Sequence, residues 1–437
     1  MGIQDLIITP IYFFLLLIVA YIIRPLVTNQ DTKPYFIPGL LVKFVGATAL
    51  GLIYQFYYGG GDTFTFHTHG SRWIWEAFMN NPLIGVKMLL SGGGQYDGSF
   101  FTYSSRIWMY RDESSYFLIK IIAIFDILTF STYSATSLFF ASFAFSGLWA
   151  LFSAFQKLYP KQTYKFSLAC LFIPSVIFWG SGILKDSVTL GALCWMTFFL
   201  FQITIFKQNQ LISLVFLLFF GWIIFSIKIY ILLCFLVSTI SYLYLQNLSR
   251  IKNSIVKIIL APLFLVIFVG AGYLILNKVT EGNSRYTIDR IAETAKITAY
   301  DIRYGWGARQ GDNSGYTLGE LDGSFGSFIS LAPKGIIVTL FRPWPWEVKN
   351  PLMLLAAIES LFFLCATIYC IYTIRFSYIL KSSSLPLVLF CLSFSLLFAF
   401  AIGVSTYNFG TLMRYKIPIM PFYSSLLILI LDLRQNS

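Results

Sequence analysis

Long apolar runs alternate with short polar stretches along the whole chain. Each run holds roughly 20 residues, the length that an α-helix needs to cross the hydrocarbon core of a bilayer. We predict eleven membrane-spanning helices, at residues 7–28, 36–57, 134–156, 165–183, 187–206, 210–227, 229–247, 257–276, 351–374, 385–405 and 416–433. The pattern therefore predicts an all-α, polytopic integral membrane protein.

One further apolar run, at 116–131, differs from the others because it carries Lys120 and Asp126. We interpret it as an interfacial or re-entrant helix; if it crosses the membrane, the chain has a twelfth span. An acidic side chain in an apolar run avoids lipid. We therefore expect Asp126 to face a cavity or to pair with Lys120.

Composition agrees with the hydrophobic pattern. Hydrophobic residues make up 57% of the chain and charged residues 11%, whereas a soluble globular protein carries about a quarter charged residues. The net charge of +12 comes largely from basic clusters in short loops, at 157–165, 250–257 and 375–381. Such clusters mark cytoplasmic loops and attract anionic lipid, so the charge indicates a bilayer partner and no nucleic acid.

The charge pattern also predicts a topology. If 116–131 lies at the interface, every basic cluster falls on one side, with the N-terminus outside and the C-terminus inside. The outer face of a single transmembrane domain, 1–437, then carries a first loop with short interfacial helices at 58–115 and a long loop at 277–350. We predict a short helix at 286–300 within the long loop, and we expect the protein to act on this non-cytoplasmic face.

The first outer loop concentrates chemically active residues. The segment 59–72 directly follows an apolar helix and contains Asp62, Arg72 and the only two histidines of the chain, His67 and His69. Titratable groups at the end of an apolar helix indicate a functional site, and glycines let backbone approach a ligand closely. Two residues apart, the histidines share a face on a strand but not on a helix.

Other outer loops add further charged residues. Lys185 and Asp186 follow the predicted span 165–183, while Arg342 ends the long loop and Arg414 precedes the last span. Simpler roles exist for two of these: Asp186 could cap a helix that starts at Ser187, and Arg414 could extend its charged end to the membrane surface.

Three segments together resemble membrane glycosyltransferases of the GT-C class. The first is Gly-Asp-Thr-Phe-Thr-Phe-His at 61–67, with an amphipathic stretch at 73–90 after it; the second runs from Ile173 to Asp186; the third is Arg-Tyr-Lys-Ile-Pro-Ile-Met-Pro at 414–421. The resemblance implies a GT-C-like fold and a polyprenyl-phosphate-linked sugar donor. The chain departs from the family in its additional first helix, 7–28, and in lacking an Asp-Glu pair at Asp62.

The resemblance assigns roles to these residues. A carboxylate that takes the proton from the acceptor hydroxyl accelerates transfer, and Asp62 and Asp186 are the catalytic candidates. Cationic groups would hold the phosphate of the donor. The candidate substrate- and phosphate-binding residues are His67, His69, Arg72, Lys185, Arg342 and Arg414. No cofactor is required by this chemistry, although Asp62 and the two histidines could bind a divalent metal.

The function that these patterns favour is sugar transfer from a polyprenyl-phosphate carrier to a glycan, lipid or protein acceptor at the outer face of the bacterial cytoplasmic membrane, within cell-envelope polysaccharide synthesis. A repeat-unit polymerase, which also uses polyprenyl-linked sugars, is one alternative. A transporter or flippase, or a non-catalytic envelope-assembly protein, is another. A transporter would show broken helices and charges at mid-membrane, and a scaffold would not need clustered Asp, His and Arg.

Overall fold

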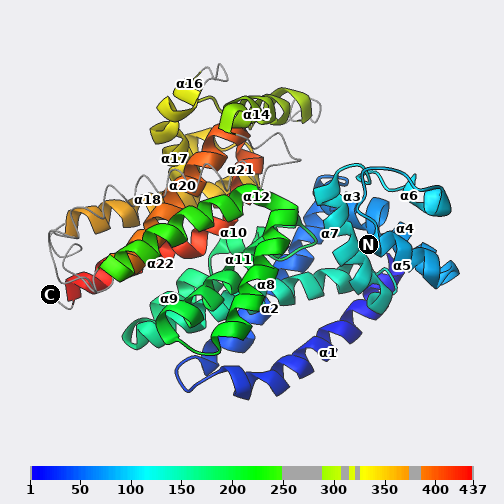
Figure 1. The fold of residues 1–437 in the computed structure, drawn as a ribbon, viewed down its shortest axis with the longest axis horizontal. Helices are drawn as coiled ribbons and strands as arrows, with labels where there is room; N and C mark the ends of the chain where they lie inside the picture. The colour runs from blue at the N-terminus through cyan, green and yellow to red at the C-terminus, as the bar shows by residue number, and fades with distance from the viewer. Residues whose placement is uncertain (1, 249–287, 307–313, 320–324, 374–384, 436–437) are drawn as a thin grey trace. The chain divides into compact units, whose positions relative to one another are not determined.

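The computed structural model describes residues 2–248, 288–306, 314–319, 325–373 and 385–435. This part of the chain is helical, as predicted, and eight of its helices are long and apolar enough to cross a membrane. The protein is therefore a polytopic membrane protein. Its contacts divide it into two units, 1–229 and 230–437, which are described separately below (Figure 1).

The eight candidate spans follow the predicted segments closely at most positions. They are Ile3–Val27, Lys33–Phe56, Tyr133–Leu158, Lys185–Phe206, Gln210–Leu248, Pro351–Thr373, Leu385–Thr406 and Phe409–Leu433. The predicted span 257–276 and the basic clusters at 250–257 and 375–381 lie outside the described residues. The run 116–131 forms α7 (Glu113–Thr129), which is not among the eight; its place at the interface remains a prediction.

The predicted span 165–183 is wrong as one continuous helix. It forms two short helices, α9 (Thr163–Leu171) and α10 (Pro174–Trp179), separated by two residues. Pro174 causes the break, because proline lacks an N–H and pushes the residue before it out of the helical conformation. Ile173 is accordingly extended, with φ −72° and ψ 123°.

The predicted spans 210–227 and 229–247 form one helical element, α12 (Gln210–Leu248). It is interrupted at a single residue, Lys228, whose backbone is non-helical with φ −146° and ψ 80°. The sequence thus located the break between the two segments correctly. It missed that helical structure resumes immediately on both sides.

Helix α8 is the centre of the first unit. Its residues, Tyr133–Leu158, are buried around most of the circumference, and it contacts helices on several sides. The partners are α1 (Ile3–Val27), α2 (Lys33–Leu52), α7, α9 and α11 (Lys185–Phe201). A helix that is apolar all round belongs in such a central position, whereas α1 is largely exposed.

Close packing of α8 against α11 depends on two glycines. A Cβ built on Gly147 would overlap the backbone of Gly191, so the two helices approach at a point where neither carries a side chain. Small residues at such crossings let membrane helices pack backbone to backbone.

Replacing Gly147 by alanine is therefore expected to lower the free energy of unfolding by about 1–3 kcal/mol, the usual cost of overpacking. The thermal midpoint of the detergent-solubilised protein measures this effect. Gly98→Ala is the control, because nothing lies within 4 Å of a Cβ at that position. Equal midpoints for the two variants would contradict the close approach of α8 and α11.

The second unit is built around α20 (Leu385–Thr406). Two helices pack against α20: α17 (Ala332–Phe341) and α22 (Met420–Gln435). The unit also contains α14 (Ile288–Tyr300), α16 (Phe325–Ser330), α18 (Pro351–Thr373) and α21 (Phe409–Tyr415). Helix α14 confirms the helix predicted at 286–300, and Gly335 meets Gly403 where α17 crosses α20.

The first outer loop, 58–115, folds into short helices, as the sequence indicated. They are α3 (Asp62–Phe66), the π-helical turn η2 (His67–Ser71), α4 (Arg72–Asn80), α5 (Pro82–Leu90), the 3₁₀ turn η3 (Gly98–Phe100) and α6 (Phe101–Ser104). Both η2 and α4 pack on α7, so α7 supports the segment that carries the candidate residues.

Candidate functional site

Asp62 is the first residue of α3 and is exposed to solvent. The three glycines at 59–61 precede it, and all have positive φ (67°, 139° and 127°), a region that favours glycine. They turn the chain sharply at the end of the long apolar helix. A carboxylate at this helix start is stabilised by the helix dipole, and its exposure leaves it accessible to a substrate.

Lys185 lies close to the same short helix. Its Nζ atom is 5.9 Å from the ring centre of Phe66, four residues after Asp62 and thus on the same helical face. Lys185 Nζ also donates to Ser114 Oγ at 2.7 Å and lies 3.3 Å from Asp112 Oδ2. The first residue of α11 is thereby tied to the start of α7.

Asp112 is the N-cap of α7, and its Oδ2 accepts a hydrogen bond from the Ser115 N–H at 3.1 Å. Burial alone would raise the pKa of the Asp112 carboxyl. The charge of Lys185 and hydrogen bonds from Ser115 and Lys185 together outweigh burial, and the pKa is lowered. The carboxylate is therefore held in its charged form.

The Asp112–Lys185 contact is expected to be sensitive to acid. Because the pKa of Asp112 is lowered in the folded protein, the stabilisation is complete above the ordinary value of 3.8 and is lost as pH falls through the lower folded-state value. Asp112→Asn keeps a capping oxygen but removes the charge. We expect the variant to be less stable than the wild type by about 0.2–1 kcal/mol at pH 6, and we expect this gap to narrow as pH falls below 3.8; a gap that does not change with pH would contradict the ion pair.

Asp186, the second catalytic candidate, is fully buried. Its Oδ1 atom lies 2.5 Å from Nζ of Lys228, which is itself buried. Asp186 does not cap α11, since the N-cap is Leu184, so the capping interpretation is wrong. Lys228 lies at the break in α12 and places its ammonium against Asp186.

The two histidines face different surroundings, since 67–71 is helical. The His67 ring is buried and meets the Tyr133 ring edge-on, with centroids 5.4 Å apart. The His69 ring stacks on Trp108, with centroids 3.9 Å apart and planes 8° from parallel. Arg72 is exposed at the start of α4. Among the described residues, no three His, Cys, Asp or Glu side chains are grouped to hold a metal ion.

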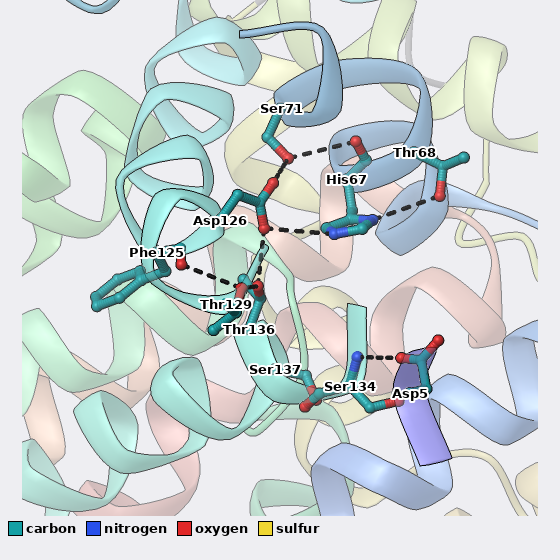
Figure 2. Close-up of polar contacts among 10 residues, drawn as sticks. All are labelled: Asp5, His67, Thr68, Ser71, Phe125, Asp126, Thr129, Ser134, Thr136 and Ser137. Atoms are coloured by element: carbon teal, nitrogen blue, oxygen red, sulfur yellow. Dashed lines mark hydrogen bonds and ion pairs between the residues drawn. The ribbon is translucent and has the colours of Figure 1, made fainter. Parts of the chain in front are cut away.

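Asp126 is fully buried, and its partner is not Lys120. Lys120 instead donates to the backbone oxygen of Ser91, so the predicted Lys120–Asp126 pair is wrong. Figure 2 shows Asp126 on α7 pointing at η2 and α8. Its carboxylate accepts Ser71 Oγ at 2.6 Å and Thr136 Oγ1 at 2.8 Å, and His67 Nε2 lies 3.4 Å from Oδ1.

In the second unit, Arg342 follows α17 and is held by several groups. Its guanidinium forms an ion pair with Glu347 and lies over the rings of Tyr316 and Phe409. Burial would raise the pKa of the Glu347 carboxyl, but hydrogen bonds from Arg342 and from the Trp344 N–H, with the charge of Arg342, lower it. Arg342 thus already has an anionic partner.

Arg414 is half-buried in α21, and its guanidinium lies 5.7 Å from the ring centre of Tyr415. The next cation, Lys416, is buried and donates to Ser360 Oγ at 3.0 Å. Ser360 in turn donates to the backbone oxygen of Arg342 at 3.0 Å. The start of the Arg-Tyr-Lys-Ile-Pro motif and the end of α17 therefore meet at one serine of α18.

One charged residue was missed by the sequence reasoning. Lys43 is fully buried in α2 and donates to the backbone oxygens of Val176 and Gly180, at 3.0 and 2.5 Å. Val176 lies in the last turn of α10 and Gly180 is its C-cap, where the final carbonyls of a helix have no partner from a following turn. A lone lysine inside a predicted span was the available signal, because such a charge needs an internal partner.

Comparison of the chain with protein-family models, with curated proteins and with solved structures finds no match.

Proposed function

We propose that the protein is a membrane glycosyltransferase that moves a sugar from a polyprenyl-phosphate carrier to an acceptor hydroxyl at the outer face of the bacterial cytoplasmic membrane. The observation that carries the proposal is the exposed carboxylate of Asp62 at the start of α3, directly after the three-glycine turn that follows the long apolar helix. We assign this exposed carboxylate as the general base that meets the acceptor.

The remaining residues then divide by position. Lys185 is fixed beside the helix of Asp62 through Phe66 and would attract the phosphate of the donor. Exposed Arg72 and the His69 ring, stacked on Trp108, would contact the sugar or the phosphate. Buried Asp186 is assigned a positioning role, because its carboxylate already binds Lys228.

Within the second unit, Arg342 and Arg414 are proposed to bind phosphate. A guanidinium held by a carboxylate and two aromatic rings, as Arg342 is, keeps a fixed orientation that suits an oxyanion. A phosphate bound at Arg342 would compete with Glu347 for the N–H groups of the guanidinium. The proposal therefore predicts that the phosphate of the lipid-linked sugar displaces Glu347.

One observation favours a second candidate, the movement of a lipid-linked sugar across the membrane. The pair α9 and α10 is a helix interrupted within an apolar segment, and the buried charge of Lys43 lies at the end of α10. Interrupted helices with buried charges are typical of transporters. A transporter would return the lipid-linked sugar chemically unchanged.

The test uses the purified full-length protein in lipid nanodiscs with a radiolabelled polyprenyl-phosphate hexose, and with lipid and glycan fractions of the source membranes as acceptors. Glycosyl transfer releases polyprenyl phosphate and moves the label to an acceptor that carries one sugar per turnover. Label in a ladder of products would indicate a polymerase instead. If the lipid-linked sugar stays intact for every sugar tested, and if it is translocated across the membrane of proteoliposomes, the transporter is favoured.

A further inference from the structure

The buried pair formed by His67 and Asp126 is not used by the proposed reaction. Figure 2 shows the His67 ring directed at Asp126 across the gap between η2 and α7. The His67 side chain is 5% exposed and that of Asp126 is fully buried. The ring atom Nε2 lies 3.4 Å from Oδ1 but makes no hydrogen bond, whereas a charge-assisted hydrogen bond of this type is about 2.7–2.9 Å long.

The hydrogen-bond donors around Asp126 are few. Ser71 and Thr136 each donate one hydroxyl proton to it, and Thr129 Oγ1 lies 2.6 Å from Thr136 Oγ1. These are neutral donors, so they do not balance a carboxylate charge. A buried, unbalanced charge costs several kcal/mol, and one proton shared with His67 makes the pair neutral overall.

We propose that His67 and Asp126 form a buried proton-binding site, and that uptake of one proton by this pair draws η2 against α7. With the proton on imidazole, Nε2–H donates to a carboxylate and Nδ1–H faces Thr68 Oγ1, 3.4 Å away. Both ring nitrogens then meet acceptors. The tightened contact holds the segment that begins with Asp62, and the inference stands independently of the chemistry of Asp62.

Several other titratable or charged residues lie on elements packed against η2, or in ring contact with His67. They are Asp62 on α3, Arg72 and Glu76 on α4, Glu113, Tyr116, Lys120 and Asp126 on α7, and Tyr133 on α8. Imidazole is the side chain that ordinarily changes charge between pH 5 and 8. The chain has two histidines. Replacing one of them leaves a single imidazole, whose protonation can then be followed alone.

The first test is solid-state NMR of the full-length protein in lipid bilayers, labelled with ¹⁵N-histidine and purified through a tag without histidine. His69→Gln leaves His67 as the single imidazole and assigns its signals. We expect the His67 nitrogens to move from the neutral toward the cationic pattern as pH falls from 8 to 5. A neutral or a cationic pattern throughout pH 5–9 would overturn the proposal.

The second test is hydrogen exchange of residues 62–71, corrected for the intrinsic pH dependence of exchange. A new hydrogen bond between charged groups should slow exchange roughly tenfold at pH 5.5 relative to pH 8. His69→Gln should keep this response, and both His67→Gln and Asp126→Asn should abolish it. If His67 titrates while exchange of 62–71 stays constant in the wild type, the proton does not act on this segment and the proposal fails.

Discussion

Asp62→Asn is expected to lower the rate of sugar transfer on the order of 10²–10⁴-fold, the range that a positioned general base contributes. Asparagine keeps the size and polarity of the side chain but does not accept a proton at neutral pH. The start of α3 should persist, because asparagine is as favourable as aspartate at helix starts. The measurement is the release of polyprenyl phosphate from the radiolabelled donor by the variant in nanodiscs.

The loop provides a matched control for this experiment. Asp97 is exposed in the same outer loop, and it accepts the Ser99 N–H at 2.8 Å as the cap of η3, a bond that asparagine can also make. Asp97→Asn should transfer sugar at the wild-type rate. If Asp62→Asn also keeps that rate while donor binding is unchanged, Asp62 is not the base, and the repeat-unit polymerase candidate gains.

The spanning helices could be predicted because burial in lipid demands long apolar runs. What hydropathy does not report is where such a run is interrupted. Pro174 is visible in the sequence, and its effect on the preceding residue is general, so the break between α9 and α10 was accessible and was overlooked. The break at Lys228 involves no proline or glycine, so no residue type in the sequence marks it, and the partner of the Lys228 ammonium, Asp186, is 42 residues away in the chain.

Partners of buried charges were the least predictable feature. Asp126 was recognised as a charge that must avoid lipid, and a cavity or a pair with Lys120 was the expected environment. The actual contacts come from η2 and α8, segments whose approach depends on the packing of several helices. His67 gave no sequence signal that separates a buried position from an exposed one, and its neighbour His69 lies on the outside against Trp108.

Breaking the Asp186–Lys228 pair is expected to lower the free energy of unfolding by about 3–5 kcal/mol, because a buried charge then loses the opposite charge that lies against it. Asp186→Asn leaves the Lys228 ammonium, and Lys228→Met leaves the Asp186 carboxylate. Unfolding by sodium dodecyl sulfate in mixed micelles measures both. Lys185→Met is the control, since Asp112, its partner, is half-exposed and such pairs contribute about 0.2–1 kcal/mol.

The double variant, Asp186→Asn with Lys228→Met, separates a true pair from two independent residues. It contains no buried unpaired charge, so it should be more stable than either single variant, although each substitution alone is destabilising. Independent sites would instead give costs that add. Additive losses, or single losses as small as that of Lys185→Met, would contradict the pair. A recovered double variant with low transfer activity would show that Asp186 and Lys228 serve the reaction as well as the fold, since stability alone would no longer account for the loss.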